Sequence, residues 1–314
     1  MIEEALCHVS ALITQTLQAA PLAVRDMTTS LSQTTGKAVR ARLLLICSCD
    51  NAGAIPDVAV RAAAAAELFH LATLVHDDVI DDAALRRGKP ALHRAFGARQ
   101  AVICGDWLLC AAMTLLSKDA NSAGDVSRLV PTFTGAVSAV CLGELEQHRR
   151  NRDLDLGVIG YLRVISGKTA ALFHVSAYAG AVAGGATERE VRKLARFGRY
   201  LGLVFQIADD CKDYESDVAA SGKPVAKDIT EGVITLPLIL AMAKNPELRA
   251  AAAAAMDSDK LGGELSAMVR GAGGTKAARE LSDRYARKAR QSLIDIVPHK
   301  CAALEEILEK TRKR

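Results

Sequence analysis

The sequence predicts an all-α fold, for three reasons. Half of the 314 residues are hydrophobic, while aromatic residues make up only 4%. Alanine dominates the apolar segments, and alanine has the highest helix propensity of all residues. The run from Val58 to Ile80 shows this most clearly, because it holds five consecutive alanines and no Gly or Pro after Pro56. We therefore expect closely packed helices and no alternation of strands and helices.

Most of the chain divides into apolar segments of helical length, separated by polar or glycine-containing loops. Pro56 suits the first turn of the longest of these helices. We expect helices over residues 1–19, 43–49, 58–80, 98–116, 125–148, 156–183 and 187–214. Residues 245–314 alternate Ala-rich helices with Gly-rich breaks and are expected to be scaffold. No shift in composition marks a boundary, so residues 1–314 are expected to form a single domain.

The bulk composition excludes several classes of protein. The net charge is +4 without a long basic block, so the tail from Lys310 to Arg314 is expected to be a solvated end and not a nucleic-acid site. The eight cysteines form no Cys-x-x-Cys pair, which favours reduced thiols in a cytoplasmic protein. No uncharged apolar run reaches membrane length and no signal-peptide pattern is present, so we expect no transmembrane segment.

Two acidic clusters each stand at the end of an apolar run. Their members are Asp77, Asp78, Asp81 and Asp82 in the first cluster, and Asp209, Asp210 and Asp213 in the second. Residues four apart on a helix lie about 5–6 Å from each other at Cβ. Two like charges about 4 Å apart repel by roughly 4 kcal/mol at an effective dielectric near 20. One such cluster would be typical of a solvated helix end, but two copies predict cation binding, and oxygen donors alone suit Mg²⁺.

Basic residues accompany these clusters in the sequence. They are Lys37, Arg40, Arg86, Arg87, Lys168 and Lys223. Salt bridges back to the aspartates are one interpretation of Arg86 and Arg87, and binding of an anion shared with the metal is the other. Lys168 lies in an otherwise apolar helix and needs an anionic partner, because an unpaired buried ammonium is costly. Metal ligands, cations and apolar helix faces together predict a diphosphate ligand with an apolar tail.

Two further features of these segments have competing interpretations. His70 stands two helical turns before Asp77 on the same face, where it is either a satisfied core residue or part of the site. Lys37 and Arg40 lie one turn apart at a helix start, where they are either solvated charges or anion ligands, because the helix dipole disfavours cations there. Residues 166–169 read Ser-Gly-Lys-Thr, like the end of a P-loop, but Leu162 stands where the required glycine would be, so we reject a nucleotide site.

Several short motifs follow one another in a characteristic order. They are Gly36-Lys37-x-x-Arg40, His76-Asp77-Asp78-x-x-Asp81, Arg86-Arg87-Gly88, Gly105-Asp106, Lys168-Thr169, Phe205-Gln206-x-x-Asp209-Asp210-x-x-Asp213, Gly222-Lys223 and Thr235-Leu236-Pro237. In these motifs the chain resembles the trans-isoprenyl (polyprenyl) diphosphate synthases. The resemblance implies a bundle of antiparallel helices around a deep central apolar cavity, usually assembled as a homodimer. It also implies Mg²⁺ as the cofactor, with three ions when diphosphate is bound.

The resemblance implies a role for each matching residue. Mg²⁺ would bind to Asp77, Asp81 and Asp209, with support from Asp78, Asp210 and Asp213. An allylic diphosphate would be held by Arg86, Lys168 and Lys223, and isopentenyl diphosphate by Lys37, Arg40, His70 and Arg87. Gln206 and Thr169 would lie near the reacting carbons. The cations would stabilise diphosphate as the allylic C–O bond ionises, isopentenyl diphosphate would attack the carbocation, and a proton would then be lost.

Product length is expected to depend on residues just before the first aspartate. In the family, bulky side chains four and five residues before it stop growth early, and here these positions hold Thr73 and Ala72. Phe69 lies three residues deeper, about 4.5 Å along the helix axis, and is the candidate floor. We therefore expect a product of geranylgeranyl length or longer. The chain departs from the common family pattern at Ala38, Ala41 and Val233, where cations or a proline often stand.

Two alternative functions differ from this prediction. A class I terpene cyclase would use the same fold and metals without isopentenyl diphosphate, but Lys37, Arg40, His70 and Arg87 would then have no ligand. A non-catalytic subunit of a heteromeric synthase is the second alternative, and the intact acidic clusters count against it.

Overall fold

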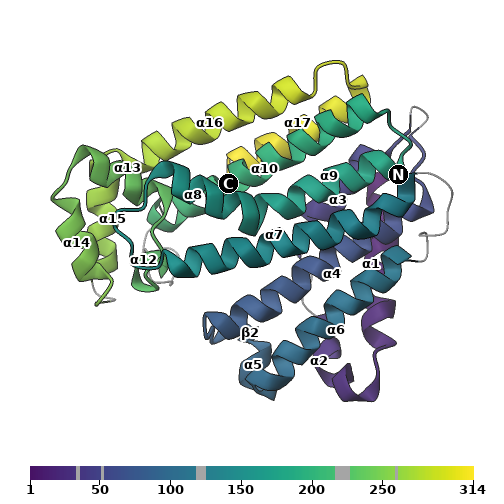
Figure 1. The fold of residues 1–314 in the computed structure, drawn as a ribbon, viewed down its shortest axis with the longest axis horizontal. Coiled ribbons are helices and arrows are strands. Elements are labelled where there is room, and N and C mark those ends of the chain that lie inside the picture. Colours follow the sequence, from purple (N-terminus) through teal and green to yellow (C-terminus); the bar gives the residue numbers. More distant parts are fainter. Residues whose placement is uncertain (33–35, 51–52, 118–124, 216–226, 259–260) are drawn as a thin grey trace. The chain divides into compact units, whose positions relative to one another are not determined.

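The computed structural model describes residues 1–32, 36–50, 53–117, 125–215, 227–258 and 261–314. Helices form nearly all of the regular structure in these ranges (Figure 1), which confirms the predicted all-α class. The helices are α1 (Ile2–Gln18), α2 (Leu22–Ser32), α3 (Val39–Ser48), α4 (Asp57–Ile80), α5 (Leu92–Phe96), α6 (Ala98–Ser117), η1 (Asp125–Arg128), α7 (Leu129–Arg149), α8 (Val158–Ile165), η2 (Ser166–Ala170), α9 (Ala171–Ala183), α10 (Glu188–Glu215), α12 (Lys227–Thr230), α13 (Leu236–Lys244), α14 (Leu248–Ala255), α15 (Gly262–Gly271), α16 (Gly274–Ser292) and α17 (Pro298–Arg312).

The chain forms two compact units. The first unit comprises Met1–Gly135, Val175–Ala195 and Val297–Lys300, and the second comprises Ala136–His174, Arg196–Ile296 and Cys301–Arg314. The expectation that residues 1–314 act as one domain stays a prediction.

Helix α4 is the central element of the first unit. It packs most extensively against α6, beside which it runs in Figure 1, and it also packs against α3 and α1. The alanines from Ala62 to Ala66 are all buried, because their small side chains let neighbouring helices approach closely. A similar close approach occurs between α9 and α3, where a Cβ on Gly180 would lie 2.1 Å from the carbonyl oxygen of Leu44.

A short hairpin follows the acidic end of α4. Strands β1 (Leu85–Arg86) and β2 (Lys89–Pro90) pair antiparallel, with Arg86 opposite Lys89. The two turn residues, Arg87 and Gly88, have φ of 52° and 79°. Positive φ at both positions is the geometry of a type I′ turn, whose twist matches the strands that it joins. The hairpin thus folds the two arginines back beside the end of α4, in the segment that the sequence predicted only as a basic loop.

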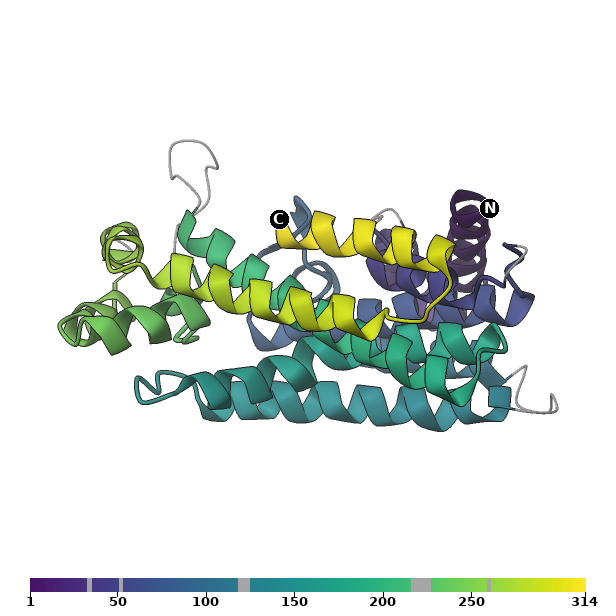
Figure 2. The same ribbon diagram turned by 90° about the horizontal axis from the view of Figure 1, so that it is seen from above.

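The second unit is built around the C-terminal part of α10, together with α8, α13, α15 and α16. Its core contains Tyr161, Ile207, Cys211, Tyr214 and Leu238, all buried. Helices α16 and α17 lie side by side in Figures 1 and 2, and Arg290 of α16 pairs with Glu305 of α17 at 2.6 Å. The pair of Arg290 and Glu305 is partly exposed, so the apolar core supplies most of the stabilisation of this unit.

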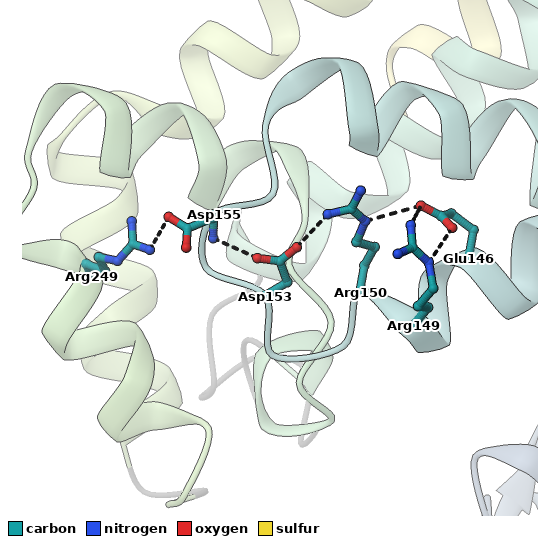
Figure 3. A network of polar contacts seen from close by, with 6 residues as sticks. All are labelled: Glu146, Arg149, Arg150, Asp153, Asp155 and Arg249. Carbon is teal, nitrogen blue, oxygen red and sulfur yellow. Dashed lines mark hydrogen bonds and ion pairs between the residues drawn. The ribbon is translucent and has the colours of Figure 1, made fainter.

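The loop before α8 is fixed by a polar network (Figure 3). Arg150 donates from Nε to Glu146 Oε1 at 3.1 Å and from Nη1 to Asp153 Oδ2 at 2.9 Å. Asp153 Oδ1 accepts from the backbone N–H of Asp155 at 3.0 Å, and Arg249 of α14 pairs with the Asp155 carboxylate. Individual pairs of this kind contribute little in water. Together they hold the loop that leads into α8.

The predicted helices agree with the observed ones to within one or two residues over α1, α4, α6 and α10. Two expectations were wrong. The segment from 156 to 183 is not one regular helix, because a π-helical turn, η2, separates α8 from α9. Residues 22–32 form helix α2, a segment for which no helix was predicted. All eight cysteines lie in the described ranges and are free thiols.

Helices α4 and α6 are long and apolar enough to cross a membrane by length and composition alone. In α4, 56% of the most apolar window is buried within the protein, and in α6 the share is 39%. Core helices of soluble proteins show the same length and composition. The expected absence of a transmembrane segment stays a prediction.

Candidate active site

The first acidic cluster occupies the C-terminal end of α4. Asp77 is half-buried and Asp81 is exposed, while Asp78 turns inward and is 4% exposed. The hairpin supplies the partner of Asp78, since Arg86 donates from Nε to both carboxylate oxygens, at 2.9 and 3.0 Å. The C-terminal end of a helix carries partial negative charge, which disfavours carboxylates unless cations accompany them. Asp78 is thus matched by Arg86, and the adjacent Asp77 and Asp81 are the carboxylates that face outward.

The fourth carboxylate of this cluster is paired elsewhere. Asp82 forms an ion pair with Arg94 at 2.7 Å, and His93 Nε2 lies 3.3 Å from Asp82 Oδ1. Both partners lie on α5, just beyond the hairpin. Asp82 therefore anchors the segment that follows the cluster, and it was not among the predicted metal ligands.

Three predicted isopentenyl diphosphate ligands, His70, Arg40 and Arg87, lie close enough to interact in the first unit. The pKa of His70 is lowered well below its usual value, first by burial and then by the charges of Arg40, Arg87 and Arg86. Arg40 is itself buried, and the guanidinium of Arg87 lies against Gly36, where an added Cβ would come within 3.0 Å of Nη2. Lys37, the fourth predicted ligand, is exposed. Convergence of positive charge around a neutral imidazole is suited to an anion.

A cavity of about 140 Å³ opens beside these cations. Apolar residues of α1 and α4, such as Val9, Leu17 and Leu71, line one part of it, and Gly36, His70 and Arg87 line another. The wall is thus mostly apolar, and Arg87 and Glu67 bring one positive and one negative side chain to it.

The second acidic cluster lies near the C-terminal end of α10, in the second unit. Asp209 is exposed, and Arg314 Nη2 lies 3.7 Å from its Oδ1 while the same guanidinium stacks over the ring of Phe205 at 4.5 Å. Asp213 is half-buried, and its Oδ2 accepts from the backbone N–H of Asp228 at 3.4 Å. The pKa of Asp228 is raised well above its usual value, first by burial and then by the neighbouring carboxylates.

Asp210 differs from its neighbours because it is buried, 4% exposed. Tyr161 donates its hydroxyl to Asp210 Oδ2 at 2.6 Å, and Gln206 donates from Nε2 to Oδ1 at 2.7 Å. Burial is the main reason that the pKa of Asp210 is raised to about 7, and the two hydrogen bonds oppose that rise. In both acidic clusters, then, the second aspartate of the Asp-Asp pair points into the protein.

The π-helical turn η2 carries Lys168 and Thr169. A Cβ on Gly143 of α7 would lie 2.3 Å from the backbone N of Lys168, so α7 and η2 touch through backbone atoms. Glu144, the next residue of α7, pairs with Lys168 Nζ at 2.6 Å and is the anionic partner that the sequence required. Thr169 donates its hydroxyl to Gln206 Oε1 at 2.7 Å. Such π-helical turns occur frequently at functional sites.

The residues expected to set product length lie on α4. Ala72 and Phe69 are fully buried, whereas Thr73 is half-buried and donates its hydroxyl to the backbone carbonyl of His70 at 2.8 Å. The ring of Phe69 stacks on that of Phe133 of α7, with centroids 5.4 Å apart. The small side chain of Ala72 is thus followed, one helical turn deeper along α4, by the stacked rings of Phe69 and Phe133.

The sequence did not single out three residues that these contacts involve. Tyr161 and Glu144 contact predicted site residues from distant positions in the sequence, and Asp228 lies beyond the motifs that the sequence singled out. A glutamate within an apolar stretch of helix signals the need for a cation, which could have indicated Glu144. Nothing local distinguished Tyr161. Lys223, predicted to hold the allylic diphosphate, lies outside the described residues.

Among the residues that the structure describes, metal ligands are not preassembled into a closed protein cage. Within the ranges that the structure describes, no group of three or more His, Cys, Asp and Glu side chains is placed to hold an ion. Asp77 and Asp81 belong to the first unit and Asp209 to the second. One or two carboxylates on each helix suit Mg²⁺, which keeps several waters and is completed by substrate phosphates.

Comparison with known proteins identifies the family. The polyprenyl synthetase family model matches residues 22–268. Heptaprenyl diphosphate synthase component 2 of Geobacillus stearothermophilus is 37% identical over 239 residues, covering 75% of this chain and 72% of that protein. Nonaprenyl diphosphate synthase of Mycobacterium tuberculosis is 32% identical over 298 residues, covering 93% and 87%.

A solved structure extends the similarity to almost the whole chain. The crystal structure of a polyprenyl synthase from Caulobacter crescentus, in complex with calcium and isoprenyl diphosphate, matches with a TM-score of 0.91 and 32% identity. The match covers 99% of this chain and 95% of that chain. The chain therefore belongs to the polyprenyl synthetase family and is a prenyltransferase.

Proposed function

We propose that the protein is a Mg²⁺-dependent trans-polyprenyl diphosphate synthase. It condenses isopentenyl diphosphate head to tail with an allylic diphosphate, and its product has geranylgeranyl length or more. The observation that carries the proposal is the shared arrangement of the two acidic helix ends. In each, one aspartate is held inside, Asp78 by Arg86 and Asp210 by Tyr161, while Asp77, Asp81 and Asp209 face outward.

The donor chemistry favours Mg²⁺ as the ion. The outward-facing groups are carboxylates, and hard divalent cations prefer oxygen ligands. The Caulobacter crescentus relative is described as a complex with calcium and isoprenyl diphosphate, and calcium is also a hard cation. We assign the metal to Asp77, Asp81 and Asp209, with three ions when diphosphate is bound. When bound, the ions would neutralise charge on the departing diphosphate.

The basic residues divide between the two substrates. Arg86, Lys168 and Lys223 would hold the allylic diphosphate, because fixed cations stabilise the charge that develops as the C–O bond breaks. Lys37, Arg40, His70 and Arg87 would hold isopentenyl diphosphate, and the positive charges of Arg40 and Arg87 that lower the pKa of His70 support this assignment. Gln206 and Thr169, joined by a hydrogen bond, would lie beside the reacting carbons.

The proposed reaction consists of ionisation, condensation and loss of a proton. The allylic C–O bond breaks and its electron pair leaves with diphosphate. The double bond of isopentenyl diphosphate attacks the allylic carbon, which forms the new C–C bond, and a carbon-bound proton passes to the departed diphosphate. The apolar helix faces exclude water, which would otherwise capture the carbocation. The products are a prenyl diphosphate extended by one isoprene unit and free diphosphate.

The product length and the assembly are part of the same proposal. Ala72 and Thr73 leave room beside α4, and the similarity to heptaprenyl and nonaprenyl diphosphate synthases supports a long product. Exposed apolar residues of the first unit, Val102 and Ile103 on α6, would form the contact of a cytoplasmic homodimer. Because the Geobacillus stearothermophilus relative is named as a component, a second, different subunit is the alternative.

The test uses the purified chain alone. After removal of metal with EDTA, it is incubated with Mg²⁺, radiolabelled isopentenyl diphosphate and dimethylallyl, geranyl, farnesyl or geranylgeranyl diphosphate in turn. We expect Mg²⁺-dependent incorporation of label into products that chromatography sizes at geranylgeranyl length or longer. The variants Asp77→Asn and Asp209→Asn should each reduce incorporation by at least a hundredfold.

Two other outcomes would assign a different role. Consumption of the allylic substrate without incorporation of label would indicate a terpene cyclase. Activity that appears only after addition of a second polypeptide would indicate a subunit of a heteromeric synthase.

A further inference from the structure

The hydroxyl of Tyr161 starts a chain of three hydrogen bonds that returns to its own segment. Tyr161 of α8 donates to Asp210 Oδ2 at 2.6 Å, and Asp210 Oδ1 accepts from Gln206 Nε2 at 2.7 Å. Gln206 Oε1 in turn accepts from the hydroxyl of Thr169 at 2.7 Å. These three hydrogen bonds therefore link α8 to α10 and α10 to η2, the turn that directly follows α8.

This arrangement holds the Asp210 carboxylate in one orientation. The side chain is buried, and its two oxygens are bound from different directions by donors of two different segments. A buried carboxylate that lost one of these donors would be left partly unsatisfied, and it would turn or take up water. The hydroxyl of Tyr161 is the donor that comes from outside α10.

The orientation of Asp210 bears directly on its neighbours in the acidic cluster. Consecutive residues on a helix point about 100° apart, so the turn of α10 that is held at Asp210 projects Asp209 away from the buried side. Asp209 is exposed, as a group that meets a ligand must be. The same chain of hydrogen bonds fixes the amide of Gln206 and, through Thr169, the turn that carries Lys168.

We propose that Tyr161 is a positioning residue for prenyl transfer. Its hydroxyl fixes Asp210, so that Asp209 is presented to the metal–diphosphate complex. The same hydrogen bonds keep Gln206 and Thr169 in fixed positions relative to Asp210. This inference rests on the function proposed above. Tyr161 itself touches neither substrate nor metal. Residues that orient metal ligands in this way typically change metal affinity or activity by about 10–100-fold when they are mutated.

The variant Tyr161→Phe removes only the hydroxyl, and Tyr214→Phe is its matched control. Tyr214 is a fully buried tyrosine of the same unit, and its hydroxyl contacts Thr235 at 3.3 Å. Both variants lose one buried hydroxyl, so both should lower the melting temperature of the ligand-free protein to a similar extent. A purely structural role of Tyr161 predicts no further difference between them.

The discriminating measurement is metal binding. Isothermal titration of Mg²⁺ into protein with inorganic diphosphate should give an affinity about tenfold or more weaker for Tyr161→Phe than for wild type or Tyr214→Phe. The concentration of Mg²⁺ that gives half-maximal prenyl transfer should rise by the same factor. The KM for isopentenyl diphosphate should stay within about twofold of the wild-type value, because its proposed ligands lie in the first unit.

A double-mutant cycle with Asp210→Asn shows whether Tyr161 acts through Asp210. If it does, the double variant should lose little more metal affinity than Asp210→Asn alone, because the effects of substitutions within one hydrogen-bond network do not add. Should Tyr161→Phe fail to fold, Tyr161→Met tests the inference instead, because this flexible apolar side chain adapts to a core, removes the same hydroxyl and should show the same loss of metal affinity. Metal affinity and Mg²⁺ dependence equal to wild type in these variants would overturn the inference. Wild-type protein without any prenyl transfer would instead overturn the proposed function.

Discussion

The rings of Phe69 and Phe133 stack, with centroids 5.4 Å apart and planes inclined by 18°. Both residues are fully buried, and they join α4 to α7 within the first unit. Phe69 lies one helical turn below Ala72, on the side away from the acidic cluster. A growing chain that passes Ala72 along α4 would meet this aromatic pair next.

Phe69→Ala should therefore lengthen the product by at least one isoprene unit. Removal of a buried phenylalanine costs about 3–5 kcal/mol of stability, so the assay needs a control with similar loss. Phe197→Ala removes an equally buried ring of the second unit and should leave the product unchanged. Chromatography of the dephosphorylated products measures the outcome, and an unchanged distribution for Phe69→Ala would show that the floor lies elsewhere.

Gly105 of α6 should not tolerate alanine, although alanine favours helices. A Cβ on Gly105 would lie 2.2 Å from Nε2 of His76, which itself contacts the carbonyl oxygen of Val102 at 3.1 Å. His76 directly precedes Asp77, so its displacement should disturb the first acidic cluster. We expect Gly105→Ala to lower both the melting temperature and the rate of prenyl transfer.

Gly135 of α7 provides the matched control for that substitution. A Cβ there would meet nothing within 4 Å, so Gly135→Ala should be neutral or stabilise the helix by about 0.5–1 kcal/mol. Equal melting temperatures and rates for the two variants would contradict the close contact between Gly105 and His76.

The helices could be predicted from the sequence because their signals are local. Alanine content and the absence of glycine and proline define α4, and its observed bounds, Asp57–Ile80, differ by one residue from the prediction. The aspartates were also evident, since their repeat is a pattern of neighbouring residues. The π-helical turn at Ser166–Ala170 was not, because close contact of η2 with Gly143 of α7 is a tertiary feature.

The partners of the inner aspartates could not be predicted either. The resemblance assigned the metal to Asp77 and Asp209 and a supporting role to Asp78 and Asp210, but it did not indicate which residue holds each supporting carboxylate. In the structure Asp78 meets Arg86 of the hairpin and Asp210 meets Tyr161 of α8. Both partners are brought in by folding, and no local pattern marks Tyr161 as the donor. The sequence suggested both a salt bridge and an anion as the partner of Arg86, and the structure shows the salt bridge.

The pair of Arg86 and Asp78 should depend on the shape of the guanidinium group. Arg86 binds both carboxylate oxygens through Nε, and lysine cannot reproduce this fork. We expect Arg86→Lys to raise the KM for the allylic diphosphate about tenfold and to lower the melting temperature. Arg94→Lys is the control, because Arg94 also pairs with an aspartate of the cluster, Asp82, which is exposed. Similar KM values for both variants would argue against a role of Arg86 in holding the allylic substrate.

His70 should make the stability of the protein depend on pH. Burial, followed by Arg40, Arg87 and Arg86, lowers the pKa of His70 well below its usual value of 6.5. Between these two pKa values the unfolded chain binds more protons at His70 than the folded protein does, so the free energy of unfolding falls as the pH falls below 6.5.

The variant His70→Gln removes this difference in proton binding between the folded and unfolded states. Urea unfolding at pH 5 to 8 should therefore show a shallower loss of stability for His70→Gln than for wild type at the acidic end. His148→Gln, which changes an exposed histidine, should follow the wild-type curve. A parallel pH dependence for wild type and His70→Gln would mean that His70 is protonated as readily in the folded protein as in the unfolded chain, and that the three arginines do not act on it.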